Sequence, residues 1–210
     1  MALHLVKKKT CRPTKTIDND FFVKHGISDF DVEVEKSKSL FAASVVGSFC
    51  APKVLQFNSK DQSISFEYFE GIQSIRNVYL NYVSAAQPSD DDFQFLVKTG
   101  TVLAEIHELM HMHNPIDWIP STLFKKSFKK KTGQDIEKLL DTMPWSIAHC
   151  DFGFSNIHYF QTKNHERELL IIDPSVNDFV TTETNLHAPI YVDLANLIAC
   201  FSGLVPFRNY

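Results

Sequence analysis

The sequence predicts an α+β fold in which a small antiparallel sheet precedes a mainly helical part. Residues 53–57 and 63–69 have the composition of strands and flank a polar turn over residues 58–62, which indicates a hairpin. Ser89 and the three Asp residues after it supply a cap and negative charge to a helix N-terminus. An amphipathic stripe then runs as far as Asn114-Pro115. Strands early in the chain and helices later favour the α+β class.

Shorter segments complete the expected order of elements. Residues 20–24 are β-rich, and the apolar spacing of residues 32–46 suits a helix. Residues 157–160 and 169–172 indicate a second hairpin, and a last helix begins near Asp193. The face of the long helix that we expect to be buried contains Phe93, Leu96, Val97, Gly100, Leu103, Ala104, His107, Met110 and His111.

The charge balance and the cysteine pattern exclude several classes of protein. The 210 residues carry 21 Lys and Arg against 25 Asp and Glu, and a net charge of −4 argues against a nucleic-acid partner held by bulk charge. Four scattered cysteines without a Cys-x-x-Cys pair argue against a disulfide scaffold and a cysteine zinc site. The N-terminal charges follow a short apolar run, the reverse of a secretory signal, and the apolar stretch 194–207 is too short to span a membrane. We expect a cytoplasmic protein with no membrane span.

Three oxygen-bearing side chains mark the segment that carries chemistry. Asn156 follows Asp151 by five residues, and Asp173 follows Asn156 by seventeen. If residues 157–160 pair with 169–172, the hairpin brings Asn156 and Asp173 together at one end. An amide oxygen beside a carboxylate suits Mg²⁺, which keeps several waters and bridges phosphates. Asp151 is then left to face an attacking hydroxyl group.

The string His149-Cys150-Asp151-Phe152-Gly153-Phe154-Ser155-Asn156, followed by Ile172-Asp173-Pro174, resembles the catalytic segment of the aminoglycoside phosphotransferase and choline kinase group. It is also similar to phosphotransferases associated with bacterial polysaccharide biosynthesis, and the match covers most of the chain. The resemblance implies a protein-kinase-like two-lobed fold, with a nucleotide-binding N-lobe (1–71) built on a small antiparallel β-sheet and a mainly helical C-lobe (72–210). The implied activity is ATP-dependent transfer of the γ-phosphate to a hydroxyl of a small molecule, such as a sugar or an amino alcohol.

The resemblance also implies a role for each matching residue, with ATP and Mg²⁺ as cofactors. Asp151 orients the acceptor hydroxyl, and His149 beside it braces the catalytic loop. Asn156 and Asp173 hold Mg²⁺, because phosphoryl transfer depends on positioning and charge neutralisation. The nucleotide-binding matches are Lys24, which neutralises the phosphates, Glu35, which orients Lys24, and the hinge residues Glu67, Tyr68 and Phe69, whose backbone meets adenine.

Two departures from the family pattern keep open a protein of the same fold without catalysis. The first 25 residues contain no Gly, whereas the family has a Gly-rich loop before the residue that Lys24 matches. A turn without Gly brings its backbone N–H groups less freely to phosphates. Only 17 residues follow Asp193, where the family usually continues with helices that wall the acceptor site. The alternative function is therefore a catalytically inactive nucleotide-binding or scaffold protein.

Residues 107–111 offer an alternative from a different class. The segment His-Glu-Leu-Met-His matches the zinc-protease pattern, in which two His four residues apart share one helix face. Asn114 and Asp117 stand where the extended form of that motif has Gly and a third His. Both imidazoles also continue the apolar stripe of the helix, so we expect packing to explain them better than metal binding.

Overall fold

The structure is a computed structural model. It describes residues 14–18, 21–25, 36–38, 48–110, 118–120, 122–175, 180–182 and 187–203. In chain order its elements are β1 (Thr14–Asp18), β2 (Phe21–His25), β3 (Phe49–Cys50), β4 (Val54–Asn58), β5 (Ser63–Glu67), β6 (Gln73–Ser74), α2 (Ile75–Ser84), α3 (Asp90–Leu109), β7 (Trp118–Pro120), α4 (Thr122–Thr132), α5 (Ile136–Leu140), β8 (Trp145–Ile147), β9 (Ile157–Gln161), β10 (Arg167–Ile171), β11 (Val180–Thr182), β12 (His187–Pro189) and α6 (Tyr191–Phe201).

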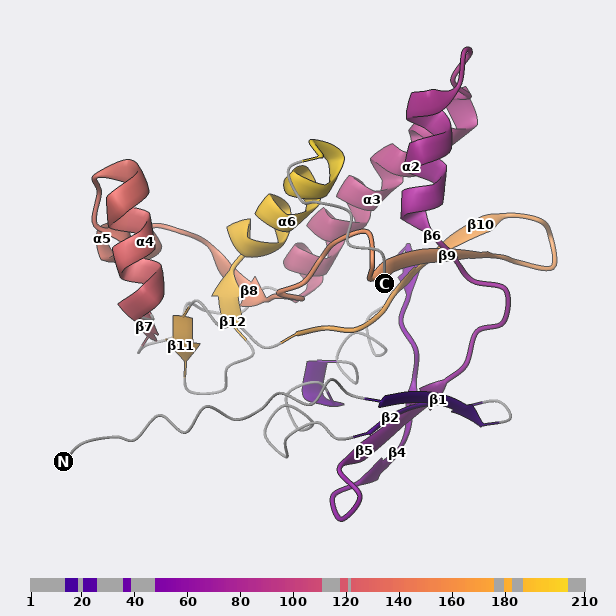
Figure 1. Cartoon of the computed structure of the whole chain (residues 1–210), viewed down its shortest axis with the longest axis horizontal. Helices are drawn as coiled ribbons and strands as arrows, with labels where there is room; N and C mark the ends of the chain where they lie inside the picture. Colours follow the sequence, from indigo (N-terminus) through magenta and orange to yellow (C-terminus); the bar gives the residue numbers. More distant parts are fainter. Residues whose placement is uncertain are drawn as a thin grey trace.

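The N-terminal sheet has the strand order β1-β2-β5-β4, and each neighbouring pair is antiparallel. The predicted strand at residues 20–24 is β2, and the predicted hairpin is β4 with β5. Alternation along β5 turns Ile64 and Phe66 into a small buried cluster. In Figure 1 this sheet lies below the helices, so the α+β prediction of a small antiparallel sheet and a mainly helical remainder is confirmed.

The long predicted helix is α3, and its start is as expected. The Ser89 side chain accepts a hydrogen bond from the backbone N–H of Asp92, which caps the helix. The prediction was wrong about its end, because α3 stops at Leu109, and residues 111–117 lie outside the described part. The buried face also differs from the predicted stripe, since Phe93 and Val97 are exposed. The buried residues of α3 are Phe95, Leu96, Thr99, Val102, Leu103 and Ile106.

The second predicted hairpin forms the centre of another sheet, with the order β3-β10-β9-β6. β9 and β10 are antiparallel, and Ile157 lies opposite Ile171, which confirms the expected pairing. β3, from the N-terminal part, joins β10 in parallel, and β6 joins β9. Strands from both sides of Gly71 therefore share this sheet, and the division into 1–71 and 72–210 stays a prediction.

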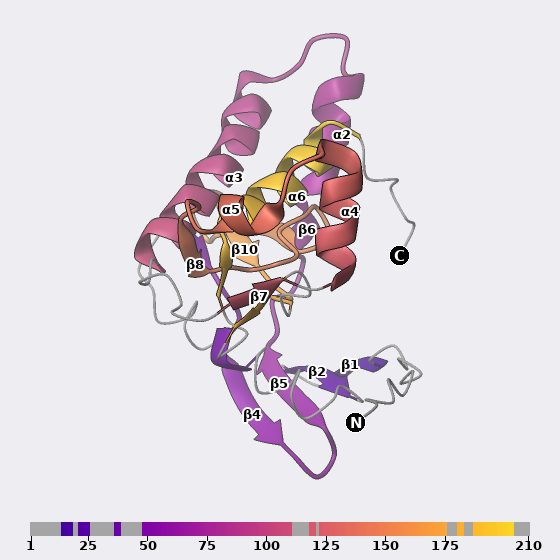
Figure 2. The ribbon, with the colours of Figure 1, turned by 90° about the vertical axis from the view of Figure 1, so that its left-hand side faces the viewer.

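Of the helices, α2 packs against the second sheet, whereas α4 and α5 pack against each other. The predicted last helix is α6, which lies between α3 and α4 in both views of the ribbon (Figures 1 and 2). α2 was not predicted, and it packs beside α3. The helix predicted over 32–46 is described only at residues 36–38, which are helical. In the described residues we find no helix that is long and apolar enough to cross a membrane.

Candidate active site

The loop after β8 brings Asp151 and Asn156 into direct contact. The Asn156 side-chain amide, Nδ2, donates to the Asp151 carboxylate and to the Asp151 carbonyl, at 2.8 Å in each case. Backbone hydrogen bonds from Gly153 to Asp151 and from Asn156 to Gly153 close the turn between them. Cys150, immediately before Asp151, has φ of 67°, a left-handed conformation that non-glycine residues seldom adopt. We call residues 148–156 the catalytic loop, after the role expected of Asp151.

Asp173 lies at the end of the hairpin that Asn156 begins, as the sequence predicts. The backbone N–H of Ile172 donates to the Asn156 carbonyl at 3.0 Å, so the hairpin pairing continues one step beyond β9 and β10. Asp173 then turns away with φ of 61°. We call residues 172–175 the metal loop, after the role expected of Asp173. The serine that ends it donates its backbone N–H to the His149 carbonyl at 2.8 Å, which joins the two loops.

Lys24 reaches this site from the N-terminal sheet. It lies opposite Ile64 in the pairing of β2 with β5, and it is 5% exposed. Its Nζ forms an ion pair with the Asp173 carboxylate and lies 5.6 Å from the centroid of the Phe66 ring. The structure thus brings together Lys24, Asp173, Asn156 and Asp151 from the predicted set. Glu35, the expected partner of Lys24, lies outside the described residues.

His149 braces both loops with its two ring nitrogens. Its Nε2 lies 2.8 Å from the Ile172 carbonyl, and its Nδ1 accepts the backbone N–H of Asp151 at 3.3 Å. An acceptor at Nδ1 and a carbonyl at Nε2 require the neutral ring with its proton on Nε2. Burial of the ring lowers the pKa of His149 to about 4, although Asp193 and the bond to Ile172 oppose the shift. At neutral pH the ring is therefore a fixed spacer between the loops.

The Asp151 carboxylate has a raised pKa. Its surroundings desolvate it, which raises its pKa, and the hydrogen bond from Asn156 works in the opposite direction. The residue is nevertheless exposed to solvent. A carboxylate fixed by one amide and open to solvent can accept a hydrogen bond from an incoming hydroxyl.

Sequence reasoning missed how α6 holds the catalytic loop. Asp193 is fully buried, and its two carboxylate oxygens accept the backbone N–H groups of His149 and Cys150, at 2.8 and 2.7 Å. One turn later, the Asn196 amide donates to the Cys150 carbonyl at 3.3 Å. Burial alone would raise the pKa of Asp193, but hydrogen bonds from His107 and His149 outweigh it and keep that pKa low. An Asp on the apolar face of a helix, with Asn three residues later, was the available signal.

An apolar cavity of about 330 Å³ lies beside these loops. All three predicted hinge residues, Glu67 to Phe69, line it, and Lys24, His149 and Asp173 form a polar part of its wall. Tyr68 and Phe69 lie beyond the end of β5, so the sheet ladder does not use their backbone groups. A mostly apolar cavity with a few convergent polar groups suits a small ligand with a flat ring and a charged tail. The other lining residues are Phe22, Ala51, Pro52, Phe66, Ile72, Leu170, Ile171, Ile172 and Pro174.

The donors at the junction of the loops fit a magnesium ion shared with phosphates. Asn156 uses its nitrogen for Asp151, which leaves its amide oxygen to bind a cation, and Asp173 adds a carboxylate. Within the described residues there is no group of three or more His, Cys, Asp or Glu side chains that could hold a metal by themselves. Two oxygen donors suit Mg²⁺, which takes its remaining ligands from water and phosphate.

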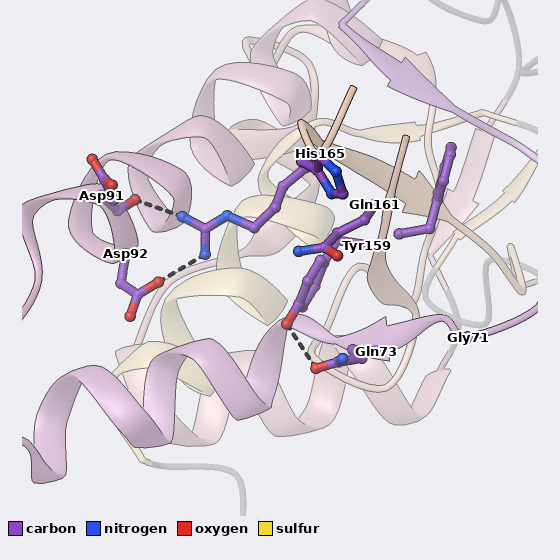
Figure 3. A pocket seen from close by; sticks show the side chains of 9 residues that line it. Gly71, Gln73, Asp91, Asp92, Tyr159, Gln161 and His165 are labelled. Carbon is purple, nitrogen blue, oxygen red and sulfur yellow. Dashed lines mark hydrogen bonds and ion pairs between the residues drawn. The ribbon is translucent and has the colours of Figure 1, made fainter. Parts of the chain in front are cut away.

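A second, more polar cavity of about 460 Å³ lies beside the segment after Gly71 and contains none of the predicted site residues (Figure 3). The Tyr159 hydroxyl donates to the Gln73 side chain at 2.7 Å. Arg167 donates to the Asp92 carboxylate at 2.7 Å and to the Asp91 carbonyl at 3.0 Å. These contacts tie the β9–β10 hairpin to the start of α3 and to β6. The walls of this cavity therefore hold in place the hairpin that carries Asn156 and Asp173 at its other end.

The position of His107 does not support the zinc-protease alternative. Its Nε2 lies 3.1 Å from the buried Asp193 carboxylate, which in turn accepts the backbone N–H groups of His149 and Cys150. His111 lies outside the described residues. The contact with Asp193 agrees with the packing role expected for His107.

Comparisons with known proteins give matches among solved structures alone. No family model matches the sequence, and no curated protein matches it. The chain is similar to choline kinase LicA from Streptococcus pneumoniae, with a TM-score of 0.44 and 13% identity, over 94% of this chain and 68% of that one. It is also similar to aminoglycoside phosphotransferase APH(3'')-Id from Streptomyces rimosus, with a TM-score of 0.44 and 12% identity, over 90% of this chain and 77% of that one.

Proposed function

We propose that the protein is an ATP-dependent phosphotransferase that moves the γ-phosphate to a hydroxyl of a small molecule, such as a sugar or an amino alcohol. The observation that carries the proposal is the meeting of Lys24 with Asp173 at the wall of the apolar cavity. Lys24 comes from the N-terminal sheet and Asp173 from the hairpin of the second sheet. A cation and a carboxylate from separate elements at one cavity are the groups that a metal–phosphate ligand requires.

The cavity supports the nucleotide part of the proposal. Its aromatic and aliphatic wall can enclose a purine ring, and the segment Glu67 to Phe69 offers backbone groups at its edge. The phosphates would lie toward Lys24, whose ammonium group would exchange Asp173 for phosphate oxygens. Asp173 and Asn156 would hold Mg²⁺, and that ion supplies neutralisation of the charge on the transferred group.

Asp151 is the residue that we assign to the acceptor. Its carboxylate is next to the expected metal ligands, because Asn156 bonds to it directly. In a loose transition state the acceptor proton leaves late, so Asp151 acts mainly by orienting the hydroxyl. His149 acts through the backbone of both loops, since its neutral ring contacts Asp151 N–H and the Ile172 carbonyl.

The test compares Asp151→Asn with Asp141→Asn, a control that removes a charge from an exposed carboxylate after α5. Purified proteins are assayed for ATP consumption with sugars, amino alcohols and aminoglycosides, and for stabilisation by ATP with Mg²⁺ in thermal melts. We expect Asp151→Asn to lose turnover by about a hundredfold or more and to keep nucleotide binding. Turnover equal to the control would remove the role of Asp151, and a wild-type protein that ATP does not stabilise would refute the proposed function.

One feature favours a second candidate, a catalytically inactive nucleotide-binding or scaffold protein. Residues 19 and 20 alone separate β1 from β2, since Asp18 lies opposite Phe21. A connection of two residues supplies few backbone N–H groups to cover phosphates. This candidate predicts ATP-dependent stabilisation in the same thermal melts, without phosphate release or transfer to any member of the acceptor panel.

A further inference from the structure

Lys38 is a buried lysine that neither the sequence motifs nor the proposed chemistry assigns. It lies in the helical segment 36–38 of the N-terminal part and is 3% exposed. Its Nζ donates to the Ser175 carbonyl at 2.6 Å and to the Cys150 sulfur at 3.4 Å. Removing an ammonium group from water is costly unless it gains strong partners, so its position calls for an explanation.

The two partners of Lys38 lie at the points that fix the two loops. Ser175 ends the metal loop, and its N–H already donates to the His149 carbonyl. Lys38 bonds to the carbonyl of the same serine, so both sides of that residue are held. Cys150 is the left-handed residue directly before Asp151. One ammonium group therefore contacts the ends of both loops and belongs to a third segment, 112 residues before Cys150.

The partners of Lys38 differ in charge from the partner of Lys24. Lys24 faces the Asp173 carboxylate, whereas no ion pair joins Lys38 to a carboxylate within the described residues. Among the described residues, its partners are a carbonyl oxygen and a sulfur atom, and neither is a carboxylate. Lys38 does not line the apolar cavity, so it acts on the site through the loops.

We propose that Lys38 is a positioning residue for phosphoryl transfer, which clamps the catalytic loop against the metal loop and ties both to the N-terminal helical segment. The inference rests on the proposed phosphotransferase function. The clamp sets the distance between Asp151 and Asp173, because each of its hydrogen bonds ends within two residues of one of them. Small displacements of such groups reduce the rate far more than they reduce nucleotide affinity.

The test uses Lys38→Met and Lys38→Arg, with Lys36→Met as a matched control on the same helical segment. Lys36 is only partly buried, and its Nζ lies over the Phe57 ring of the N-terminal sheet. The first readout is amide hydrogen exchange of the two loops without nucleotide. The second is the pair kcat and KM for ATP. We expect Lys38→Met to speed exchange in both loops and to lower kcat roughly tenfold to a hundredfold, with KM changed by less than about threefold.

The variants separate a clamp from a residue that only supports folding. Lys38→Arg should recover part of kcat, because its guanidinium keeps the charge and donors, and Lys36→Met should match the wild type. If Lys38→Met does not fold, Lys38→Gln takes its place, since its amide still donates to one partner. Unchanged exchange in the loops overturns the clamp, and faster exchange with unchanged kcat overturns its role in the reaction. A wild-type protein that neither binds nor consumes ATP overturns the proposed function, and with it the reaction that Lys38 would serve.

Discussion

Replacing Asp193 with Ala should destabilise the protein and loosen the catalytic loop. The carboxylate is fully buried and accepts two backbone N–H groups, from His149 and Cys150, at 2.8 and 2.7 Å. It also lies 3.1 Å from His107 Nε2. The Ala variant removes every one of these acceptors and leaves the donors in a space from which water is excluded.

The size of the effect follows from the number of donors left without an acceptor. A buried polar group that loses its partner costs about 1–3 kcal/mol, and two backbone N–H groups are affected. A hydrogen bond to a charged group is worth about 1.5–3 kcal/mol, so the loss of two such bonds costs roughly 3–6 kcal/mol in total. We therefore expect Asp193→Ala to lower the free energy of unfolding by about 4 kcal/mol. Asp193→Asn keeps one acceptor oxygen and should cost about half as much.

Urea unfolding at neutral pH measures these differences, and amide exchange at His149 and Cys150 shows where they arise. Asp141→Ala is the control, because an exposed carboxylate outside such a network usually changes stability by less than about 0.5 kcal/mol. A loss below about 1 kcal/mol for Asp193→Ala would refute the reasoning. So would a large loss with unchanged exchange at the two amides, since the cost would then lie elsewhere.

Two further predictions concern the same loop. The pKa of His149 in the folded protein, about 4, lies below its ordinary value of 6.5, so the unfolded chain takes up the proton first as the pH falls. The contribution of the neutral His149 to the free energy of unfolding is therefore fully present above pH 6.5, and that free energy should drop by about 3 kcal/mol by pH 4. A proton-NMR titration of His149 with a midpoint near 6.5 would contradict this. A methyl group added at Gly153 would lie 3.2 Å from the Cys200 sulfur, so Gly153→Ala should lower the melting temperature by a few degrees. Adding Cys200→Ala should restore it; melting curves of the single and double variants that do not differ would show that the contact is not tight.

Local spacing predicted the parts of the site that depend on one hairpin. Asn156 and Asp173 lie at the same end of the hairpin because the short strands between them pair in register, and period and turn composition are visible in the sequence. The position of Lys24 opposite Asp173 followed instead from the family resemblance, because a contact across 149 residues leaves no periodic trace. The same reason hid Lys38, whose partners are 112 and 137 residues away.

The face of α3 shows a different limit of sequence reasoning. Thr99 was not part of the predicted stripe, yet it is buried and donates its hydroxyl to the Leu96 carbonyl at 2.6 Å. Gly100, placed in that stripe, is exposed. A threonine that satisfies its hydroxyl within its own helix can take a core position. The spacing of apolar residues therefore predicted the helix correctly, but it predicted the buried face of the helix only in part.

The three acidic side chains of the site differ in whether they would have to exchange their present partners when a ligand binds. Asp193 is committed to backbone N–H groups, and Asp151 is held by Asn156 within its own loop, so neither has to move. The ion pair of Asp173 joins it to Lys24 on a separate sheet, and the lysine is almost wholly buried. Separating the pair would leave the buried lysine charge without compensation, which costs several kcal/mol. A ligand that offered only an anion to Lys24, or only a cation to Asp173, would leave the other charge bare. On the proposed function, this ion pair therefore favours a metal and a nucleotide that arrive as one unit over either of them alone.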